Sequence, residues 1–221
     1  MVTARSTAKP SARERLLAAA NELFYAEGVQ SVGIDRVIEH AGVAKASLYN
    51  TFGGKEQLIR AYLDHRHAGV TARLVRAVES RDTPREQMLA VFESQGAQFG
   101  KPAFHGCAFI RASAETSPGS LVAEAADNYR AWLRELFARL ADEAGAADPE
   151  ALARQLQLLY DGATVAAAMD HDPTVAVASR AAAAALIAAA TGDFGWAPPP
   201  PAPTAAAGPG APDPLPATAL G

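Results

Sequence analysis

The chain has 221 residues, of which 49% are apolar, and a formal net charge of −4. A chain of this length and composition can bury a real core, which excludes a wholly disordered protein. The single cysteine, Cys107, excludes an internal disulfide framework and a cysteine-rich zinc site, so we expect a cytoplasmic protein. The N-terminus lacks a signal-peptide core and residues 181–190 are too short and alanine-rich to cross a bilayer, so no membrane contact is expected.

Charge is distributed unevenly along the chain. Residues 1–80 contain 11 Lys and Arg against 8 Asp and Glu, whereas the remainder contains 9 against 16. This imbalance predicts that any contact with a polyanion is confined to the first 80 residues.

Apolar residues recur at helical spacing along almost the whole chain, and no run of alternating β-branched residues is present. The sequence therefore predicts an all-α fold of about nine helices. Thr83, Ser117, Asp148 and Asp172 each precede a proline suited to the first helical position, which predicts four helix starts. The predicted helices cover residues 11–27, 34–41, 45–52, 54–80, 84–99, 104–116, 119–145, 149–169 and 173–191.

The first three predicted helices have the pattern of a helix-turn-helix. Ser11 is expected to cap the first helix and Gly28 to end it. The second helix has its apolar residues on one face, and Gly42 then turns the chain. Leu48 and Phe52, four residues apart, are expected to anchor the third helix on the same core.

The polar residues of the third helix must then occupy its outer surface, which suits a DNA groove. Lys45 can neutralise a phosphate, and the hydroxyls of Ser47 and Tyr49 can hydrogen-bond phosphate oxygens. Asn50 can pair with the N6/N7 edge of adenine, and Lys55 begins a further helix whose free N–H groups also favour a phosphate. The alternative is that these residues are merely solvated. The predicted DNA-contacting set is Lys45, Ala46, Ser47, Tyr49, Asn50, Thr51 and Lys55.

The stretch GIDRVIEHAGVAKASLYNTFGGKEQLIRAYL, residues 33–63, resembles the DNA-binding domain of TetR-family transcriptional regulators. The turn, the lysine, the hydroxyl, the Leu-Tyr pair, the phenylalanine, the Lys-Glu pair and the leucine all fall in register with that family's signature. The resemblance covers residues 12–65, and it implies a homodimer that binds a palindromic double-stranded DNA operator. It further implies that Asn50 reads bases. The implied backbone contacts are Lys45, Ser47, Tyr49 and Lys55.

Three capping positions depart from the family pattern, because Gly33, Ala44 and Gly54 stand where Ser or Thr is common. A glycine cap costs a few tenths of a kcal/mol relative to serine, and an alanine cap costs about 1 kcal/mol. The fold tolerates such losses, but the phosphate contacts of the missing hydroxyls are lost. The DNA grip is therefore expected to rest on Lys45, Tyr49 and backbone N–H groups.

The chain is expected to divide into a flexible arm at 1–10, a DNA-binding domain at 11–55, a ligand-binding and dimerisation domain at 56–192, and a disordered Pro/Ala-rich tail at 193–221. The last two helices are the predicted dimer interface, because their alanines allow close backbone approach. The alternative is that the alanines reflect ordinary helix propensity in a monomeric bundle. The candidate interface residues are Leu156, Leu159, Tyr160, Ala183, Leu186 and Ile187.

An effector cavity in this domain would lie between helices and be lined by apolar and aromatic groups with a few polar ones. Its occupant would be a small molecule of unknown identity. The candidate lining residues are Phe92, Phe99, Phe109, Arg111, Tyr129, Trp132 and Tyr160.

No catalytic constellation is recognisable. His105 and Cys107 are two residues apart and point in different directions on a helix, so no nucleophile–base pair forms. Cys107 is expected to be a buried structural thiol, with redox sensing as the alternative, and neither a metal nor a cofactor is expected. The resemblance to the TetR family implies a repressor released from its operator by a small molecule. An activator of the same fold, or an enzyme or adaptor that keeps the helix-turn-helix as scaffold, are the alternatives.

Overall fold

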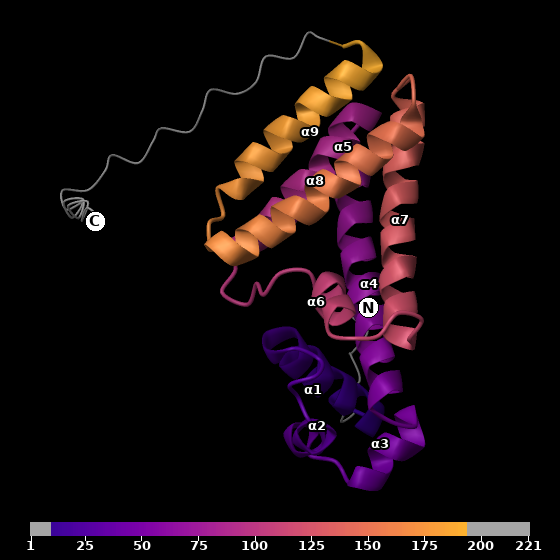
Figure 1. Ribbon diagram of the computed structural model, residues 1–221, viewed down its shortest axis with the longest axis vertical. Helices are drawn as coiled ribbons and strands as arrows, with labels where there is room; N and C mark the ends of the chain where they lie inside the picture. Colours follow the sequence, from indigo (N-terminus) through magenta and orange to yellow (C-terminus); the bar gives the residue numbers. More distant parts are fainter. Residues whose placement is uncertain (1–9, 194–221) are drawn as a thin grey trace, which may run out of the picture.

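The computed structural model describes residues 10–193, and these residues form nine helices and no strand (Figure 1), which confirms the all-α prediction. The predicted arm up to residue 9 and the predicted tail from residue 194 lie outside the described residues. The helices are α1 (Ala12–Glu27), α2 (Ile34–Ala41), α3 (Lys45–Phe52), α4 (Lys55–Glu79), α5 (Pro84–Phe99), α6 (Ala108–Ala114), α7 (Leu121–Glu143), α8 (Pro149–Asp170) and α9 (Val175–Thr191).

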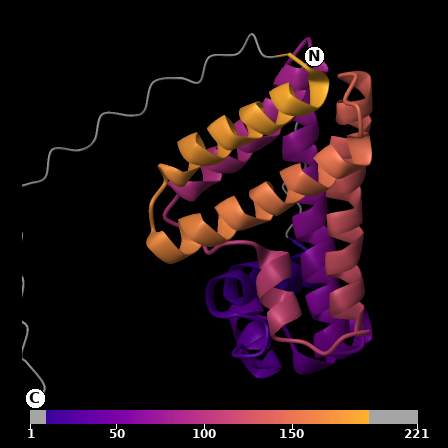
Figure 2. The same cartoon turned by 45° about the horizontal axis from the view of Figure 1, so that its top comes forward.

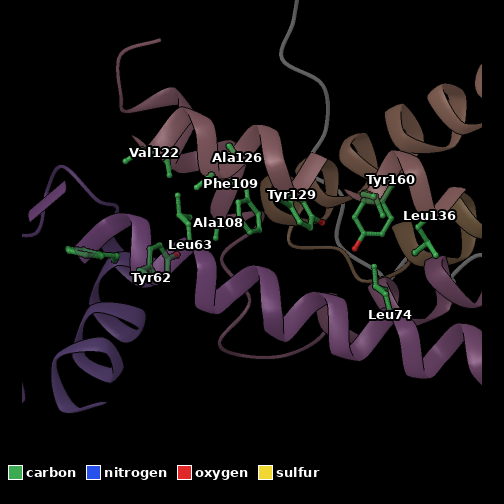
Figure 3. Close-up of a cluster of buried hydrophobic side chains, with 14 of the residues drawn as sticks. Tyr62, Leu63, Leu74, Ala108, Phe109, Val122, Ala126, Tyr129, Leu136 and Tyr160 are labelled. Carbon is green, nitrogen blue, oxygen red and sulfur yellow. The ribbon is translucent and has the colours of Figure 1, made fainter. Parts of the chain in front are cut away.

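The helices form two parts that share α4. Helices α1, α2 and α3, here called the N-terminal unit, gather at one end, and α4 runs from them into a bundle with α5, α7, α8 and α9 (Figures 1 and 2). Short α6 lies where the bundle meets the N-terminal unit. One cluster of buried apolar side chains extends through both parts (Figure 3). It begins at Tyr62 and Leu63 of α4, near the N-terminal unit, and reaches Leu136 of α7 and Tyr160 of α8, which pack beside a later part of α4. The two parts are therefore mechanically continuous.

Several helix ends follow the local sequence rules. The Ser11 hydroxyl accepts from the Glu14 N–H (3.2 Å), and the Glu14 carboxylate accepts from the Ser11 N–H (2.7 Å), a reciprocal cap. Thr83 and Asp148 cap α5 and α8 ahead of their prolines, as predicted. Gly28 ends α1 with φ 95°, a conformation that favours glycine.

The helix start predicted at Ser117–Pro118 is wrong. Helix α7 begins at Leu121, and Ser120 is its capping residue. The reason is Gly119, whose φ of 76° lies in the left-handed region and separates the proline from the right-handed helix.

Two other starts are later than predicted. Helix α9 begins at Val175 because the Asp172 carboxylate accepts from the N–H and the hydroxyl of Thr174 (2.8 and 2.7 Å), which forms a tight turn in place of a helix cap. Helix α6 begins at Ala108, four residues after the predicted start, because Gly106 has φ 88°. The segment before α6 is therefore a loop, and its backbone groups are free to contact other parts of the chain.

Helices α5 and α9 approach closely at Gly96. A Cβ atom added there would lie 2.5 Å from the Cβ of Ala176, closer than two such atoms can pack. We therefore expect Gly96→Val to lower the free energy of unfolding by about 1–3 kcal/mol, because the helices must separate. Urea denaturation measures this change. Gly69→Val in α4, where an added Cβ meets nothing within 4 Å, is the matched control and should stay within about 0.5 kcal/mol; equal losses in both variants would contradict the close approach.

Candidate nucleic-acid interface and internal cavity

The turn between α2 and α3 has the geometry of a helix-turn-helix. Gly42 adopts φ 60°, and its N–H donates to the carbonyls that end α2, at 3.0 Å for Glu39. The Val43 N–H donates to the Ile38 carbonyl (3.3 Å), which closes the turn. Leu48 then lies fully buried on the core of the N-terminal unit. The buried leucine fixes which side of α3 faces outward.

The outward side of α3 carries the predicted contact residues. The Thr51 hydroxyl donates to the Ser47 carbonyl (2.6 Å), so its hydrogen is already used within the helix. Tyr49 is 47% exposed and presents its hydroxyl to solvent. Of the predicted set, Lys45, Ala46, Tyr49, Asn50 and Thr51 are exposed, whereas Ser47 and Lys55 are half-buried.

The two lysines already have partners in the free protein. Lys45 Nζ lies 2.8 Å from Asp35 Oδ1, and this hydrogen bond, together with the charge of Asp35, raises the pKa of Lys45. Lys55 Nζ donates to the Gln30 carbonyl at 3.3 Å, at the first turn of α4. Both ammonium groups are therefore held on the same side of the N-terminal unit as α3, and a phosphate at Lys45 would compete with an exposed carboxylate.

Sequence reasoning missed Arg15. This α1 residue donates from Nη1 to the carbonyls of Gly42 (2.9 Å) and Ala41 (3.3 Å), so it ties the turn to the first helix. No local pattern links positions that are 26 and 27 residues apart, because the contact exists only once the helices have packed.

A cavity of about 450 Å³ lies at the junction of the N-terminal unit and the bundle. Helices α1, α4, α5, α7 and α8 and the segment from residue 101 to residue 109 line it. Four residues of the predicted ligand set lie on its wall, namely Phe99, Phe109, Tyr129 and Tyr160. The rings of Phe109 and Tyr129 are stacked with centroids 4.0 Å apart, and Figure 3 shows both rings beside α4.

The other three predicted ligand residues lie elsewhere. Phe92 is fully buried and packs against Phe137 within the core of the bundle. Trp132 is half-buried and packs its ring against His67. Arg111 turns away from the cavity toward α1. Helical spacing predicted that these residues face inward, but it could not distinguish the solid core from the cavity.

Tyr25 of α1 connects the cavity wall to the N-terminal unit. Its hydroxyl donates to the Gly106 carbonyl (3.0 Å) and accepts from the His105 N–H (3.2 Å), while Arg111 Nη1 donates to its carbonyl (2.6 Å). Tyr25 also lines the cavity. One residue of the N-terminal unit is thus fastened to the loop before α6 and to α6 itself.

The C-terminal end of α6 makes a second contact with the N-terminal unit. Glu115 Oε2 accepts from the Gln30 N–H at 2.8 Å, and a Cβ added to Gly28 would lie 2.7 Å from Glu115 Oε1. The glycine therefore leaves the space that the carboxylate occupies. Helix α6 contributes to the cavity through its first residues and holds the loop before α2 through its last.

Cys107 lines the cavity and caps the N-terminus of α6. Burial raises the pKa of its thiol, so the sulfur is protonated near neutral pH and a poor nucleophile. Cys107 is half-buried, and its role as a structural or a redox-sensing thiol stays a prediction. Within residues 10–193, no group of three or more His, Cys, Asp or Glu side chains is placed to hold a metal ion, and no helix is long and apolar enough to cross a membrane.

The predicted dimer residues lie mainly inside the bundle. Leu156, Ala183 and Ile187 have no exposed surface and Tyr160 is 5% exposed, so a partner could not reach them without unpacking the core. Leu159 and Leu186 are half-buried against the same core. The outward side of the two helices is also apolar, and we call it the α8–α9 face. It comprises Leu158, Gly162, Val165, Met169, Val177, Ala178, Ala182, Ala185 and Ala189.

The chain was compared with known proteins. A family model described as bacterial regulatory proteins, tetR family, matches residues 16–62, from α1 into α4. The crystal structure of a TetR-family transcriptional regulator from Streptomyces coelicolor superposes with a TM-score of 0.78 at 37% identity, and the match covers 81% of this chain and 96% of that chain.

Two curated relatives match over less than half of this chain. The HTH-type transcriptional regulator LmrA of Bacillus subtilis is 32% identical over 88 residues, which are 39% of this chain and 47% of LmrA. The HTH-type transcriptional repressor NemR of Escherichia coli is 30% identical over 105 residues, which are 47% of this chain and 53% of NemR. The chain thus spans about half the length of the curated relatives it matches. Since the Streptomyces regulator is matched over nearly its whole length, and the family pattern coincides with the turn and the buried leucine of α3, the chain belongs to the TetR family of helix-turn-helix transcriptional regulators.

Proposed function

We propose that the protein is a cytoplasmic repressor that binds a palindromic operator as a homodimer and leaves it when a small molecule occupies the cavity. The observation that carries this proposal is the outward side of α3, where Tyr49 and Asn50 are exposed beside the buried Leu48. An exposed helix whose polar residues are aimed by a buried anchor is the arrangement that enters a DNA major groove. NemR, which is similar over 47% of this chain, is a repressor. Activation from the same operator is the alternative.

The roles of the α3 residues follow from their chemistry. Asn50 is exposed and can pair with adenine through both its amide atoms. Lys45 can exchange Asp35 for a phosphate, because the ion pair is exposed on both sides and therefore weak. Lys55 stands at the start of α4, where the helix dipole also favours an anion. Exposed Tyr49 adds a hydroxyl that can hydrogen-bond a phosphate oxygen. We infer one base-reading residue, Asn50, and three phosphate contacts.

A palindromic operator requires two reading helices about 34–36 Å apart, which a symmetric dimer supplies. The α8–α9 face is the surface that fits this role. Met169, Leu158 and Val177 are 73%, 66% and 51% exposed, respectively, although all three are large and apolar. An exposed apolar surface on a helix pair marks a protein contact, and antiparallel α8 and α9 can pack against the same pair of a second copy.

The cavity is coupled to the N-terminal unit through α6 as well as α4. A ligand in the cavity would touch Tyr25 and the loop that Tyr25 holds, and Glu115 at the other end of α6 holds Gln30. A ligand that prefers a dimer with wrongly spaced N-terminal units would lower operator affinity by the difference between its affinities for the two conformations. We infer that the two coupled parts have different roles. A DNA-binding domain covers residues 11–55, and a ligand-binding and dimerisation domain covers residues 56–192.

Selection of bound sequences from random duplex DNA tests the proposal most directly. We expect a palindrome whose half-sites are centred one helical turn apart, about 10 base pairs, or a multiple of that spacing. Binding should weaken steeply as salt rises, because Lys and Arg release counterions from phosphates. Recovery of sequences without a symmetric consensus, or salt-independent binding, would refute an operator-binding dimer.

Asn50→Ala and Lys55→Ala should affect DNA binding differently. Asn50→Ala should cost about 1–3 kcal/mol at one base pair of each half-site and leave affinity for random DNA nearly unchanged. Lys55→Ala should weaken binding to all duplexes similarly and reduce the salt slope by about one unit. Fluorescence anisotropy with operator and random duplexes measures both effects, and exposed Gln57→Ala is the control. If both variants lost the same factor on both duplexes, the division into reader and clamp would be wrong.

A further inference from the structure

The cavity carries an unbalanced positive charge. Arg66 and Arg73 of α4 and Lys101 after α5 line it, and no Asp or Glu does. Several other arginines of the bundle do pair with carboxylates, as Arg130 does with Asp161 at 2.7 Å. In the part of the chain that the structure describes, none of the three cavity cations has a carboxylate within ion-pair distance.

The three cations contact only uncharged groups, so their positive charges remain available to a bound anion. The Arg66 guanidinium lies 3.5 Å from the centroid of the Tyr25 ring, and its buried Nε atom has no hydrogen-bond partner. Arg73 makes only a long hydrogen bond of 3.4 Å to the Ser94 carbonyl. Lys101 Nζ donates to Gln98 Oε1 at 2.8 Å. Arg66 and Arg73 are half-buried and Lys101 is exposed. Three cations without a carboxylate on one partly enclosed wall make the cavity electrostatically positive, so the site favours a negatively charged occupant.

The other ionisable groups on the wall do not supply a negative charge. Burial raises the pKa of Tyr160 to about 12 and the pKa of Tyr129 well above its usual value. Burial also raises the pKa of the Cys107 thiol. All three groups are therefore neutral at pH 7. The carboxylate that interacts with them, Asp161, is held by Arg130 outside the lining.

Gln95 adds a specific acceptor. Its side chain is 3% exposed and lines the cavity, and its Nε2 donates to the Tyr160 carbonyl (2.7 Å) and to Thr164 Oγ1 (2.6 Å). The carbonyl can only accept, which orients the amide and leaves Oε1 as the buried atom without a donor. Oε1 itself is fully buried just behind the cavity wall, so an O–H or N–H group of a bound molecule would satisfy it after a small shift of the Gln95 side chain.

Aromatic rings supply flat apolar contacts around these polar groups. Phe109 and Tyr129 are stacked at 4.0 Å on one part of the wall, and Phe99 and Phe104 lie with centroids 5.2 Å apart on another. In Figure 3 the rings of Phe109, Tyr129 and Tyr160 follow one another along α4. Surfaces of this kind pack against planar rings. The volume of about 450 Å³ accommodates a molecule of two or three fused rings.

We propose that the cavity binds a planar aromatic anion, whose carboxylate or sulfonate pairs with Arg66 and Arg73 and whose O–H or N–H group donates to Gln95 Oε1. The argument for anion binding uses only the residues of the cavity. The expectation that a bound anion releases DNA rests on the proposed function, because only an operator-binding repressor can be released in this way.

Isothermal titration of the full chain with 2-naphthoate and with its neutral isostere 2-naphthamide tests the charge preference. We expect the carboxylate to bind at least about tenfold more tightly, and 6-hydroxy-2-naphthoate to bind more tightly still, because its hydroxyl lies far from its carboxylate and is free to donate to Gln95. Equal binding of acid and amide, or no binding of any of the three probes, would overturn the proposal. This comparison uses the unaltered chain, so it does not depend on how any variant folds.

Variants locate the site. Arg73→Met should remove the preference for the acid, whereas Arg76→Met, one turn further along α4 and exposed outside the cavity, should keep it. Gln95→Met should remove only the advantage of the hydroxylated probe. If Arg73→Met kept the full preference while remaining helical by circular dichroism, the pairing with Arg73 would be wrong.

The failure of this inference and the failure of the proposed function give different results. Naphthoate binding with unchanged operator affinity would support the anion site and refute release by ligand. Operator binding to a palindrome without any naphthoate binding would support the DNA-binding role and refute the anion site.

Discussion

Replacing both Leu158 and Met169 with aspartate should convert the protein to a monomer whose operator affinity is about 10²–10⁴-fold lower. Both side chains project from the α8–α9 face and are more than half exposed, so the change leaves the core of each subunit intact. At a two-fold interface each copy brings its own carboxylates, which doubles the desolvation cost and adds repulsion. Each N-terminal unit would then bind a half-site alone and lose the high effective concentration that its partner provides. Sedimentation velocity and fluorescence anisotropy measure the two effects.

Leu121→Asp is the matched control for the dimer. Leu121 is also a large apolar residue, 37% exposed, but it lies at the start of α7, away from the α8–α9 face. This variant should remain dimeric and bind operator normally. A double aspartate variant that still sedimented as a dimer at micromolar concentration would place the interface on another surface.

Leu48→Ala should lower the free energy of unfolding by about 2–5 kcal/mol, whereas the neighbouring Tyr49→Ala should change it by less than about 0.5 kcal/mol. Leu48 has no exposed surface and joins α3 to the core, whereas Tyr49 is 47% exposed. Removing the leucine leaves a cavity beneath α3, and the lost packing frees the helix that presents Asn50. Urea denaturation measures the difference in stability.

The same two variants should also differ in DNA binding, one in overall affinity and the other in sequence preference. Tyr49→Ala, which stays folded, should weaken all duplexes alike by removing one phosphate contact. Leu48→Ala should lose the preference for operator over random DNA at temperatures where the protein is still largely folded, because Asn50 is no longer held in register. If Leu48→Ala were as stable as Tyr49→Ala, α3 would not depend on this anchor.

Helix α6 changes how the coupling between cavity and DNA surface is understood. Helix α4 is one link, because this single long helix runs from the N-terminal unit into the bundle (Figure 1). The structure adds a second link, in which Arg111 and Glu115 hold the N-terminal unit while Phe109 faces the cavity. We therefore expect a ligand that shifts the first turn of α6 to act on Tyr25 through Arg111, and on Gln30 through the whole helix and Glu115.

Local chemistry made the helix-turn-helix predictable from the sequence. The residues that define it, from Val37 in α2 to Leu48 in α3, lie within a dozen positions of one another, and the apolar spacing alone places them on one core. The cap at Ser11 was predictable for the same reason, since its partner Glu14 is three residues away. The start at Pro118 failed where one glycine with positive φ overrode a good capping pair.

Longer-range features depended on tertiary structure. Helices α8 and α9 are so rich in alanine that their apolar spacing does not define a single face, so the sequence could not distinguish their buried residues from their exposed ones. Leu156 and Leu158 are two residues apart, yet one is buried and the other is 66% exposed. Packing of α8 against α5 and α7 decides which of the two leucines is buried, and no pattern within α8 contains that information.

The sequence by itself determined an all-α fold and a helix-turn-helix whose third helix presents polar residues outward, because those features arise from contacts between near neighbours in the chain. Only the tertiary structure decided the cavity and its charge. Arg66, Gln95, Lys101 and Tyr160 come from four separate segments, and each alone is an ordinary polar or aromatic residue of a helical bundle. Their unpaired charges and unsatisfied acceptor acquire meaning only when folding brings them to one wall, without a carboxylate on it.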